Sequence, residues 1–163
     1  MTSSPTRLLV ELADAGVDFV VIGAIAVVAH GHIRTTRDVD ITYATDQENL
    51  DALGRALVVL DARLRGVAEV VPFVPDGRTL RGAELLTLET TAGSLDLLAA
   101  PPGAPRYADL KARAERVEIE DRRVLIASIE DLIAMKHTAG RPRDLEDIEA
   151  LQAIRRIRLE ASA

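Results

Sequence analysis

One stretch of the sequence decides the fold: Gly23-Ala24-Ile25-Ala26-Val27-Val28-Ala29-His30-Gly31-His32-Ile33-Arg34-Thr35-Thr36-Arg37-Asp38-Val39-Asp40-Ile41. It follows a mostly apolar, β-branched run at residues 17–22, which predicts a buried strand. Gly23 breaks that strand, and residues 24–29 predict a short buried helix. Residues 38–43 then alternate polar and apolar, as a half-buried strand does. A glycine turn followed by paired acids on a strand indicates chemistry on a nucleoside triphosphate.

The flanking sequence predicts further helices and strands. Helices are expected after Ser3 or Ser4, after Asp46, at residues 107–114 and after Ser128, with a last helix beyond residues 140–142. Two hairpins are expected, one at residues 85–98 and one at 117–126, whereas residues 67–82 show only turn signals. This order predicts one α+β domain over residues 1–163. Its sheet-containing part is expected at 1–126 and its C-terminal helices at 127–163.

Composition excludes several classes of protein. The chain has 163 residues, of which 48% are hydrophobic and 28% charged, as in globular domains. Aromatic residues make up only 2%, so base-stacking platforms are hard to build, and the absence of Cys excludes disulfides and thiolate zinc sites. A net charge of −6 argues against bulk nucleic-acid binding. No apolar run reaches membrane-spanning length and the first residues do not resemble a signal peptide, so we expect no membrane contact and a cytoplasmic location.

Asp38 and Asp40 form the first candidate site. Side chains alternate along a strand, so these carboxylates share one face with Thr42. Two like charges held close need a positive partner, and Mg²⁺ prefers carboxylate oxygens together with substrate phosphates. The motif alone is more often the solvated face of an edge strand. The glycine turn and the polar residues before it favour a metal site.

Asp96 is the best supplier of a third carboxylate. It lies in the short apolar run 94–98, where a lone acid is otherwise hard to explain. We expect it to bind the catalytic metal and to help deprotonate an incoming hydroxyl. The alternative is an ordinary Asp near a strand end whose hydrogen bonds are satisfied locally.

Phosphate contacts are expected from the residues before the acidic pair. Gly23 opens a helix after a strand, which offers free backbone N–H groups to an anion. Arg34 could pair with a phosphate oxygen and Thr36 could donate its hydroxyl, although both also suit an ordinary polar loop. The sequence holds neither a P-loop nor a Gly-x-Gly-x-x-Gly motif. His30 is expected to hydrogen-bond locally rather than to bind metal.

With these residues in hand, the chain resembles the DNA polymerase β-like nucleotidyltransferase superfamily, and most closely the small bacterial members that include abortive-infection type toxins. The resemblance runs from about residue 17 to 155. It is carried by four segments: residues 21–26, 30–41, 94–98 and 128–148.

The resemblance implies a mixed sheet flanked by helices, with a helical C-terminal part closing one side of a nucleotide cleft. Asp38, Asp40 and Asp96 match the metal-binding carboxylates of the family, and Gly23 matches the first residue of its phosphate-holding turn. Ala24 stands where the family more often has glycine or serine, so it keeps the backbone N–H but offers no hydroxyl.

The C-terminal match adds further expected contacts. Lys136 would bind the triphosphate or the base-ribose end of the nucleotide, and Arg141 and Asp144 would close the cleft. Lys136 could equally be a solvated helix residue. Asp144 and Asp147 also suit a helix N-terminus through its dipole alone, and for Asp147 we prefer that explanation.

The expected activity is transfer of a nucleoside monophosphate from a nucleoside triphosphate to an acceptor hydroxyl, with Mg²⁺ or Mn²⁺ as cofactor. The acceptor could be RNA, as for a toxin with an antitoxin partner, or a protein. It could also be a small molecule, as for aminoglycoside or lincosamide adenylyltransferases. The alternative from another class is a non-catalytic nucleotide-binding module with the same fold, which Ala24 favours and the complete set of three acids disfavours.

Overall fold

A computed structural model describes residues 4–66 and 73–163 and contains a single seven-stranded mixed sheet. Its strands are β1 (Phe19–Ile22), β2 (Val39–Tyr43), β3 (Arg63–Leu64), β4 (Leu85–Thr90), β5 (Gly93–Leu98), β6 (Glu115–Ile119) and β7 (Arg122–Ile126). The helices are α1 (Pro5–Asp14), α2 (Gly23–Ala29), α3 (Gln47–Val59), α4 (Gly77–Arg81), α5 (Tyr107–Arg113), α6 (Ile129–Ala139) and α7 (Pro142–Ala161). The predicted α+β class is confirmed.

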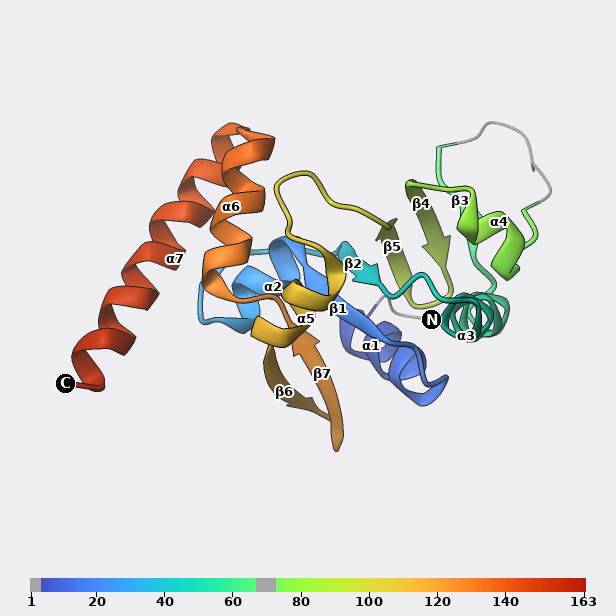
Figure 1. Ribbon diagram of the computed structural model, residues 1–163, viewed down its shortest axis with the longest axis horizontal. Coiled ribbons are helices and arrows are strands. Elements are labelled where there is room, and N and C mark those ends of the chain that lie inside the picture. The colour runs from blue at the N-terminus through green and yellow to red at the C-terminus, as the bar shows by residue number, and fades with distance from the viewer. Residues whose placement is uncertain (1–3, 67–72) are drawn as a thin grey trace.

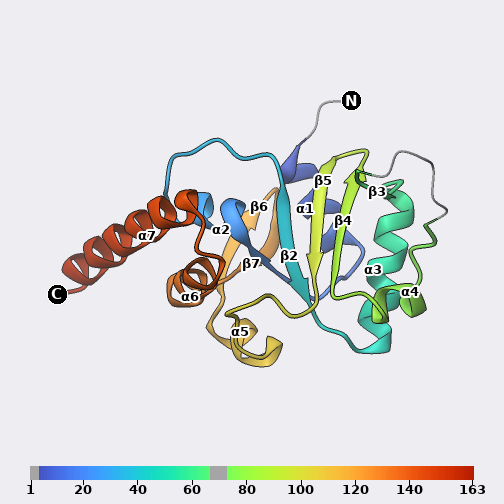
Figure 2. The same ribbon diagram turned by 90° about the horizontal axis from the view of Figure 1, so that it is seen from above.

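The strand order places the chemically interesting strands in the middle of the sheet. It reads β3-β4-β5-β2-β1-β7-β6. Strand β2 pairs antiparallel with β1 and parallel with β5, while β1 pairs parallel with β7. The segment after α2 arches over to the start of β2, as Figure 2 shows. Because Ile22 at the end of β1 is the register partner of Asp40, the glycine turn and the acidic pair meet at the same edge of β1 and β2.

Local signals in the sequence explain where the elements begin and end. Ser4, Asp46 and Ser128 cap α1, α3 and α6 by accepting a hydrogen bond from a backbone N–H three residues on. Gly140 ends α6 in the left-handed conformation at φ 65°, which a glycine adopts without strain. Because Pro142 cannot extend α6, the chain turns and begins α7.

The core is aliphatic, as the composition requires. Leu, Val, Ile and Ala make up nearly all of its buried side chains, and the largest fully buried residue is Tyr43 on β2. Helices α6 and α7 pack together at one end of the molecule, and α3 and α4 lie at the other (Figure 1). Among the described residues, no helix is both long and apolar enough to cross a membrane.

Most predicted elements are present, with two additions and one correction. The short helix α4 and the two-residue strand β3 were not predicted, and residues 67–72 of the turn-rich segment lie outside the described residues. The expectation that His30 bonds locally is wrong. Its Nε2 contacts the carbonyl oxygen of Ala127 at 2.8 Å, and its Nδ1 lies 2.9 Å from Glu115. The division at residue 126 and the cytoplasmic location stay predictions.

Candidate active site

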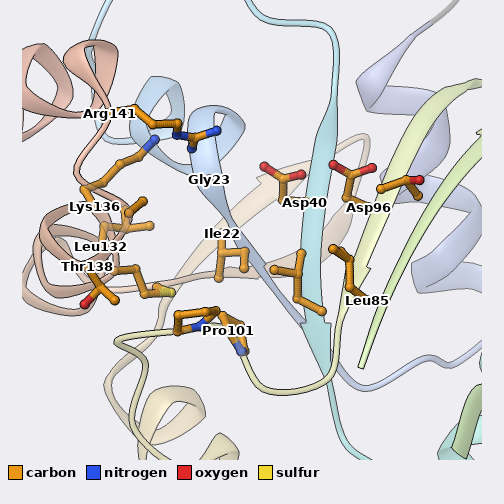
Figure 3. A pocket seen from close by; sticks show the side chains of 15 residues that line it. Ile22, Gly23, Asp40, Leu85, Asp96, Pro101, Leu132, Lys136, Thr138 and Arg141 are labelled. Atoms are coloured by element: carbon orange, nitrogen blue, oxygen red, sulfur yellow. The ribbon is translucent and has the colours of Figure 1, made fainter. Parts of the chain in front are cut away.

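Asp40 and Asp96 stand side by side on the two central strands. Strands β2 and β5 run parallel, and Asp40 is the register partner of Asp96. Their carboxyl groups point the same way (Figure 3). Burial, together with the negative charges of Asp96 and Asp38, raises the pKa of Asp40 to about 7, while the charge of Lys136 acts in the opposite direction. Two neighbouring carboxylates are therefore held where a cation would relieve their repulsion.

Arg65 holds one of the two carboxylates. Its Nη2 donates to Oδ1 of Asp96 at 2.6 Å, in a partly buried ion pair. Arg65 directly follows the edge strand β3, and its backbone N–H donates to the carbonyl oxygen of Thr87 on β4. Since Thr87 is the register partner of Asp96, the arginine side chain reaches across β4 to the carboxylate on β5. This contact fixes the orientation of Asp96.

Gly23 is required by its contact with Asp40. Its φ of 69° lies in the left-handed region that favours glycine. A side chain at this position would also collide with the carboxylate of Asp40. The glycine predicted as a phosphate turn thus has a second reason to be there, since it lets the start of α2 approach the acid on β2. The backbone of Ala24 follows in the same turn.

Lys136 forms the opposite wall of the cleft. Its side chain is buried on α6, and its Nζ lies 3.0 Å from Asp144 and 2.9 Å from Asp147, both near the start of α7. It is therefore not the solvated helix residue that the sequence left open. The two aspartates are at most 1% exposed, so their carboxylates are bound by cations within the protein rather than by water.

Arg34 and Arg141 contact the same two aspartates. Together with Lys136 they form one side of the cleft, which we call the basic wall. Arg34 Nη1 contacts both carboxylate oxygens of Asp147, at 2.6 and 2.7 Å, and Arg141 Nε donates to Asp144 at 2.8 Å. Burial alone would raise the pKa of Asp144, but hydrogen bonds from Arg141 and Lys136 lower it to about 2. Likewise, hydrogen bonds from Lys136 and Arg34 outweigh burial and lower the pKa of Asp147. Asp147 is thus a partner of two basic side chains, beyond the helix-dipole role preferred from sequence.

One cavity of about 140 Å³ gathers the metal-binding and nucleotide-binding residues expected from the sequence, whereas Asp144 lies behind its basic side chains and does not line it. Its acidic lining comes from β5, β2 and the residue just before β2, and its basic lining from α6, the start of α7 with its N-cap, and the segment before β2. A larger cavity of about 420 Å³ adjoins it along Asp40 and Asp96. The small cavity is lined by Gly23, Ala24, Arg34, Thr36, Asp38, Asp40, Asp96, Lys136, Arg141 and Arg143.

Sequence reasoning did not assign a site role to Arg65, Arg143 or Asp147. Arg143 lies in the first turn of α7, two residues after Arg141, so proximity alone could have suggested it. Arg65 meets a carboxylate 31 residues away, and Asp147 meets an arginine 113 residues away. Contacts of that range leave no spacing signal in a single sequence.

Asp38, Asp40 and Asp96 form the other side of the cleft, which we call the acidic wall. Their carboxylate oxygens suit a hard divalent cation. Within residues 4–66 and 73–163, no three His, Cys, Asp or Glu side chains converge into a complete metal cage. Asp40 and Asp96 face one cavity, and the exposed Asp38 lies at its rim just before β2. Mg²⁺ commonly takes one or two carboxylates and completes its shell with water and substrate phosphates, so two converging acids and a third nearby suit it.

Comparison with known proteins identifies this architecture. Residues 93–161 match a family described as nucleotidyltransferases of unknown function, DUF6036. No curated protein matches the chain in sequence at a significant level. Several solved structures match over nearly its whole length. The lincosamide antibiotic adenylyltransferase LnuA, in a lincomycin-bound crystal structure, shares 16% identity at a TM-score of 0.60, covering 94% of this chain and 99% of its own.

Two further structures agree. An antigenic nucleotidyltransferase-like protein from Paracoccidioides brasiliensis shares 18% identity at a TM-score of 0.57, with 90% of this chain and 72% of that chain covered. The enzyme ANT(2")-Ia, in complex with adenylyl-2"-tobramycin, shares 18% identity at a TM-score of 0.56, with 96% and 95% covered. At such identities the matches establish the fold, while the abortive-infection group expected from sequence is not confirmed. The chain thus has the fold of the polymerase β-like nucleotidyltransferases, and its C-terminal part matches a nucleotidyltransferase family.

Proposed function

We propose that this protein transfers a nucleoside monophosphate from a nucleoside triphosphate to the hydroxyl group of an acceptor. The observation that carries the proposal is the single cavity in which two strand-borne carboxylates face a wall of basic side chains. The fold and the family model support the same class of activity. A phosphoryl-type transfer needs positioning and charge neutralisation above all, and those are what the two walls offer.

The basic wall would bind the phosphates that leave. Lys136, Arg34 and Arg141 are held in place by buried aspartates, so they lose little conformational freedom when a triphosphate arrives. The backbone N–H groups at the start of α2 and the hydroxyl of Thr36 add neutral donors. Together they would stabilise the negative charge that accumulates on pyrophosphate as it departs.

The acidic wall would serve the attacking side. Asp38, Asp40 and Asp96 would hold Mg²⁺ or Mn²⁺, which when bound supplies neutralisation of phosphate charge. Asp96, oriented by Arg65, would accept the hydroxyl proton of the acceptor. The acceptor oxygen then forms a bond to the α-phosphorus, the bond from that phosphorus to the oxygen bridging to the β-phosphate breaks, and pyrophosphate leaves.

Two classes of acceptor are considered, a small molecule and RNA. Structures with this fold include one adenylyltransferase for lincosamides and one complex holding an adenylylated tobramycin, which favours a small-molecule acceptor. A toxin acting on RNA, with an antitoxin partner and a cytoplasmic location, is the alternative. The net charge of −6 argues against it.

Labelled nucleotides test the activity directly. The protein is incubated with Mg²⁺ and each of ATP, CTP, GTP and UTP labelled at the α-phosphate, against total RNA, total protein and a panel of antibiotics. We expect label in one acceptor fraction with wild-type protein and none with Asp40→Ala. The variant Asp121→Asn, at an exposed turn with φ 64°, serves as a folded control that keeps full activity. Equal labelling by the wild type and Asp40→Ala would reject the mechanism.

Calorimetry separates the enzyme from a non-catalytic module. Each nucleotide is titrated with and without Mg²⁺. Binding that depends on the metal supports the proposed enzyme, whereas a chain that binds no nucleotide under either condition would contradict it.

A further inference from the structure

Beyond Asp40 and Asp96 the lining of the cleft becomes mostly apolar. The larger cavity, of about 420 Å³, runs from Asp40 and Asp96 to the loop at Pro101, between β4, β5 and α6 (Figure 3). Its charged lining residues are the two acids with Lys136 and Arg141, which also line the smaller cavity. Its remaining lining is mostly apolar, with Ile22, Leu85, Leu98, Pro101, Leu132 and Met135 as the main contributors.

Strand register puts apolar side chains directly beside Asp96. Strands β4 and β5 pair antiparallel, with Thr87 opposite Asp96 and Leu85 opposite Leu98. Residues two apart on a strand share a face, so all four side chains lie on one face of this hairpin. Leu85 is 57% exposed, so its side chain is available for contact with a ligand. A molecule whose hydroxyl reaches Asp96 would therefore lay its body on these leucines.

A tightly packed loop closes the far end of this apolar region. The segment from Pro101 to Pro105 follows β5, and Gly103 within it has a φ of 84°. A side chain at Gly103 would collide with Thr138 and with the carbonyl oxygen of Ala134 on α6. The loop thus lies directly against α6, so the end wall made by Pro101 is already in place without a ligand.

The geometry of an in-line transfer indicates that the acceptor binds in the apolar part of the larger cavity, next to Leu85 and Leu98. In an in-line displacement the attacking oxygen and the leaving oxygen lie on opposite sides of the phosphorus. The basic wall would take the leaving pyrophosphate, so the attacking hydroxyl enters from the side of Asp96 and Leu85. Beside Leu85 and Leu98 the charged lining residues are the two acids, whereas Lys136 and Arg141 line the cavity toward the basic wall, and the nearby Arg65 is paired with Asp96. Because both acids would already hold the metal, no further carboxylate is left there for a polycation, and no unpaired basic side chain among the described lining residues awaits a phosphate-rich chain.

We propose that the acceptor is a small, uncharged molecule with an apolar body next to its reactive hydroxyl, bound on Leu85 and Leu98. This rests on the proposed transfer activity and names its substrate class. A polycationic aminoglycoside would need further carboxylates beside its hydroxyl, and RNA would need basic side chains for the flanking phosphates. Apart from Asp40, Asp96, Lys136 and Arg141, the described lining of the larger cavity is uncharged.

A matched pair of probes tests the acceptor class without knowing the acceptor. Octyl β-glucoside, kept below its micelle concentration, and methyl β-glucoside carry the same sugar hydroxyls and differ only in the apolar chain. Both are titrated by calorimetry, beside tobramycin and total transfer RNA, into the wild type, Leu85→Lys and Val59→Lys. Val59 is 68% exposed on α3, so it controls for a lysine replacing an exposed apolar residue elsewhere.

We expect octyl glucoside to bind the wild type and Val59→Lys at least about tenfold more tightly than methyl glucoside does. Leu85→Lys should weaken the binding of octyl glucoside about tenfold. Equal binding of the two glucosides, an equal effect of both lysine variants, or tighter binding of tobramycin or RNA would overturn the proposal. Nucleotide binding, measured in the same samples, reports separately on the proposed transfer activity.

Discussion

Lys136 and Asp40 face the same cavity, yet the chain balances their charges differently. On the basic wall, Lys136, Arg34 and Arg141 all contact buried aspartates of α7, and those contacts lower the pKa values of Asp144 and Asp147. On the acidic wall, Asp40 has another acid as its strand neighbour, and burial together with that charge raises its pKa to about 7. The basic wall is therefore complete within the protein, whereas the acidic wall needs a cation from outside.

The largest effect should come from removing an acid from the incomplete wall. Asp96→Asn keeps the shape of the side chain but removes its charge and its ability to accept the hydroxyl proton. We expect kcat to fall about a thousandfold, because charge stabilisation and proton acceptance are lost together. Initial rates of label transfer measure it. Asp51→Asn, an exposed change on α3, should leave the rate within twofold of wild type, and a similar fall there would show the effect to be nonspecific.

Removing an aspartate that supports the basic wall should lower the free energy of unfolding of the protein. Asp147→Ala leaves the buried Lys136 and the partly exposed Arg34 without one of their partners, and breaking a buried ion pair such as that of Lys136 costs about 3–5 kcal/mol. Denaturant unfolding of Asp147→Ala beside Glu146→Ala measures the difference. Glu146 is the exposed neighbour on α7, so its removal should change stability by less than about 0.5 kcal/mol. Equal losses would mean that the buried aspartate does not support the wall.

Asp40 should make the metal-free protein less stable at high pH. The pKa of its carboxyl is about 7 in the folded protein and near 3.8 in the unfolded chain, so the folded state binds the extra proton between these values. Stability from this group is therefore fully present below about pH 4 and is lost as pH rises through 7. With a chelator present, Asp40→Asn should raise the unfolding free energy at pH 8 by about 1–3 kcal/mol and change nothing at pH 4. A gain that is the same at both values would rule out titration of Asp40 as its cause.

A smaller effect is expected at Arg65, the one cation that we find on the acidic wall among the described residues. Arg65→Ala removes the ion pair to Asp96 without removing the acid itself. We expect kcat to fall about tenfold, since an outer partner of a metal-binding group typically contributes that much. Arg65→Lys should recover part of the loss because it keeps the charge. No difference between Ala and Lys at this position would show that the charge of Arg65 plays no part.

Much of the fold could be predicted because its signals are local. Ser4, Asp46 and Ser128 are helix caps that act over three residues, and the hairpin turn at Glu120 and Asp121 contains an Asp, which tolerates positive φ. The helix α4 is only five residues long and β3 only two, so neither shows a periodic pattern. Strand β3 also depends on pairing with β4, more than twenty residues later, which no short-range signal encodes.

In the candidate site, too, the residues with local signals could be predicted and the long-range contacts could not. Asp40 and Asp96 could be predicted because burying a carboxylate in an apolar strand costs free energy unless the carboxylate is paired or binds a metal. Gly23 was found as a turn, but its contact with Asp40 depends on how the two strands pair. The partners of Lys136 and Arg34 on α7 could not be inferred, because a charged residue near a helix start has an adequate local explanation.

The central claim is that the acidic wall takes up a divalent cation. Electron paramagnetic resonance tests this most directly, because the signal of added Mn²⁺ falls when the ion leaves solution and binds protein. In the presence of a non-hydrolysable nucleoside triphosphate, wild type and Asp121→Asn should take up Mn²⁺, while Asp40→Asn should take up at least about tenfold less at the same concentration. Equal uptake by Asp40→Asn and wild type would contradict the account.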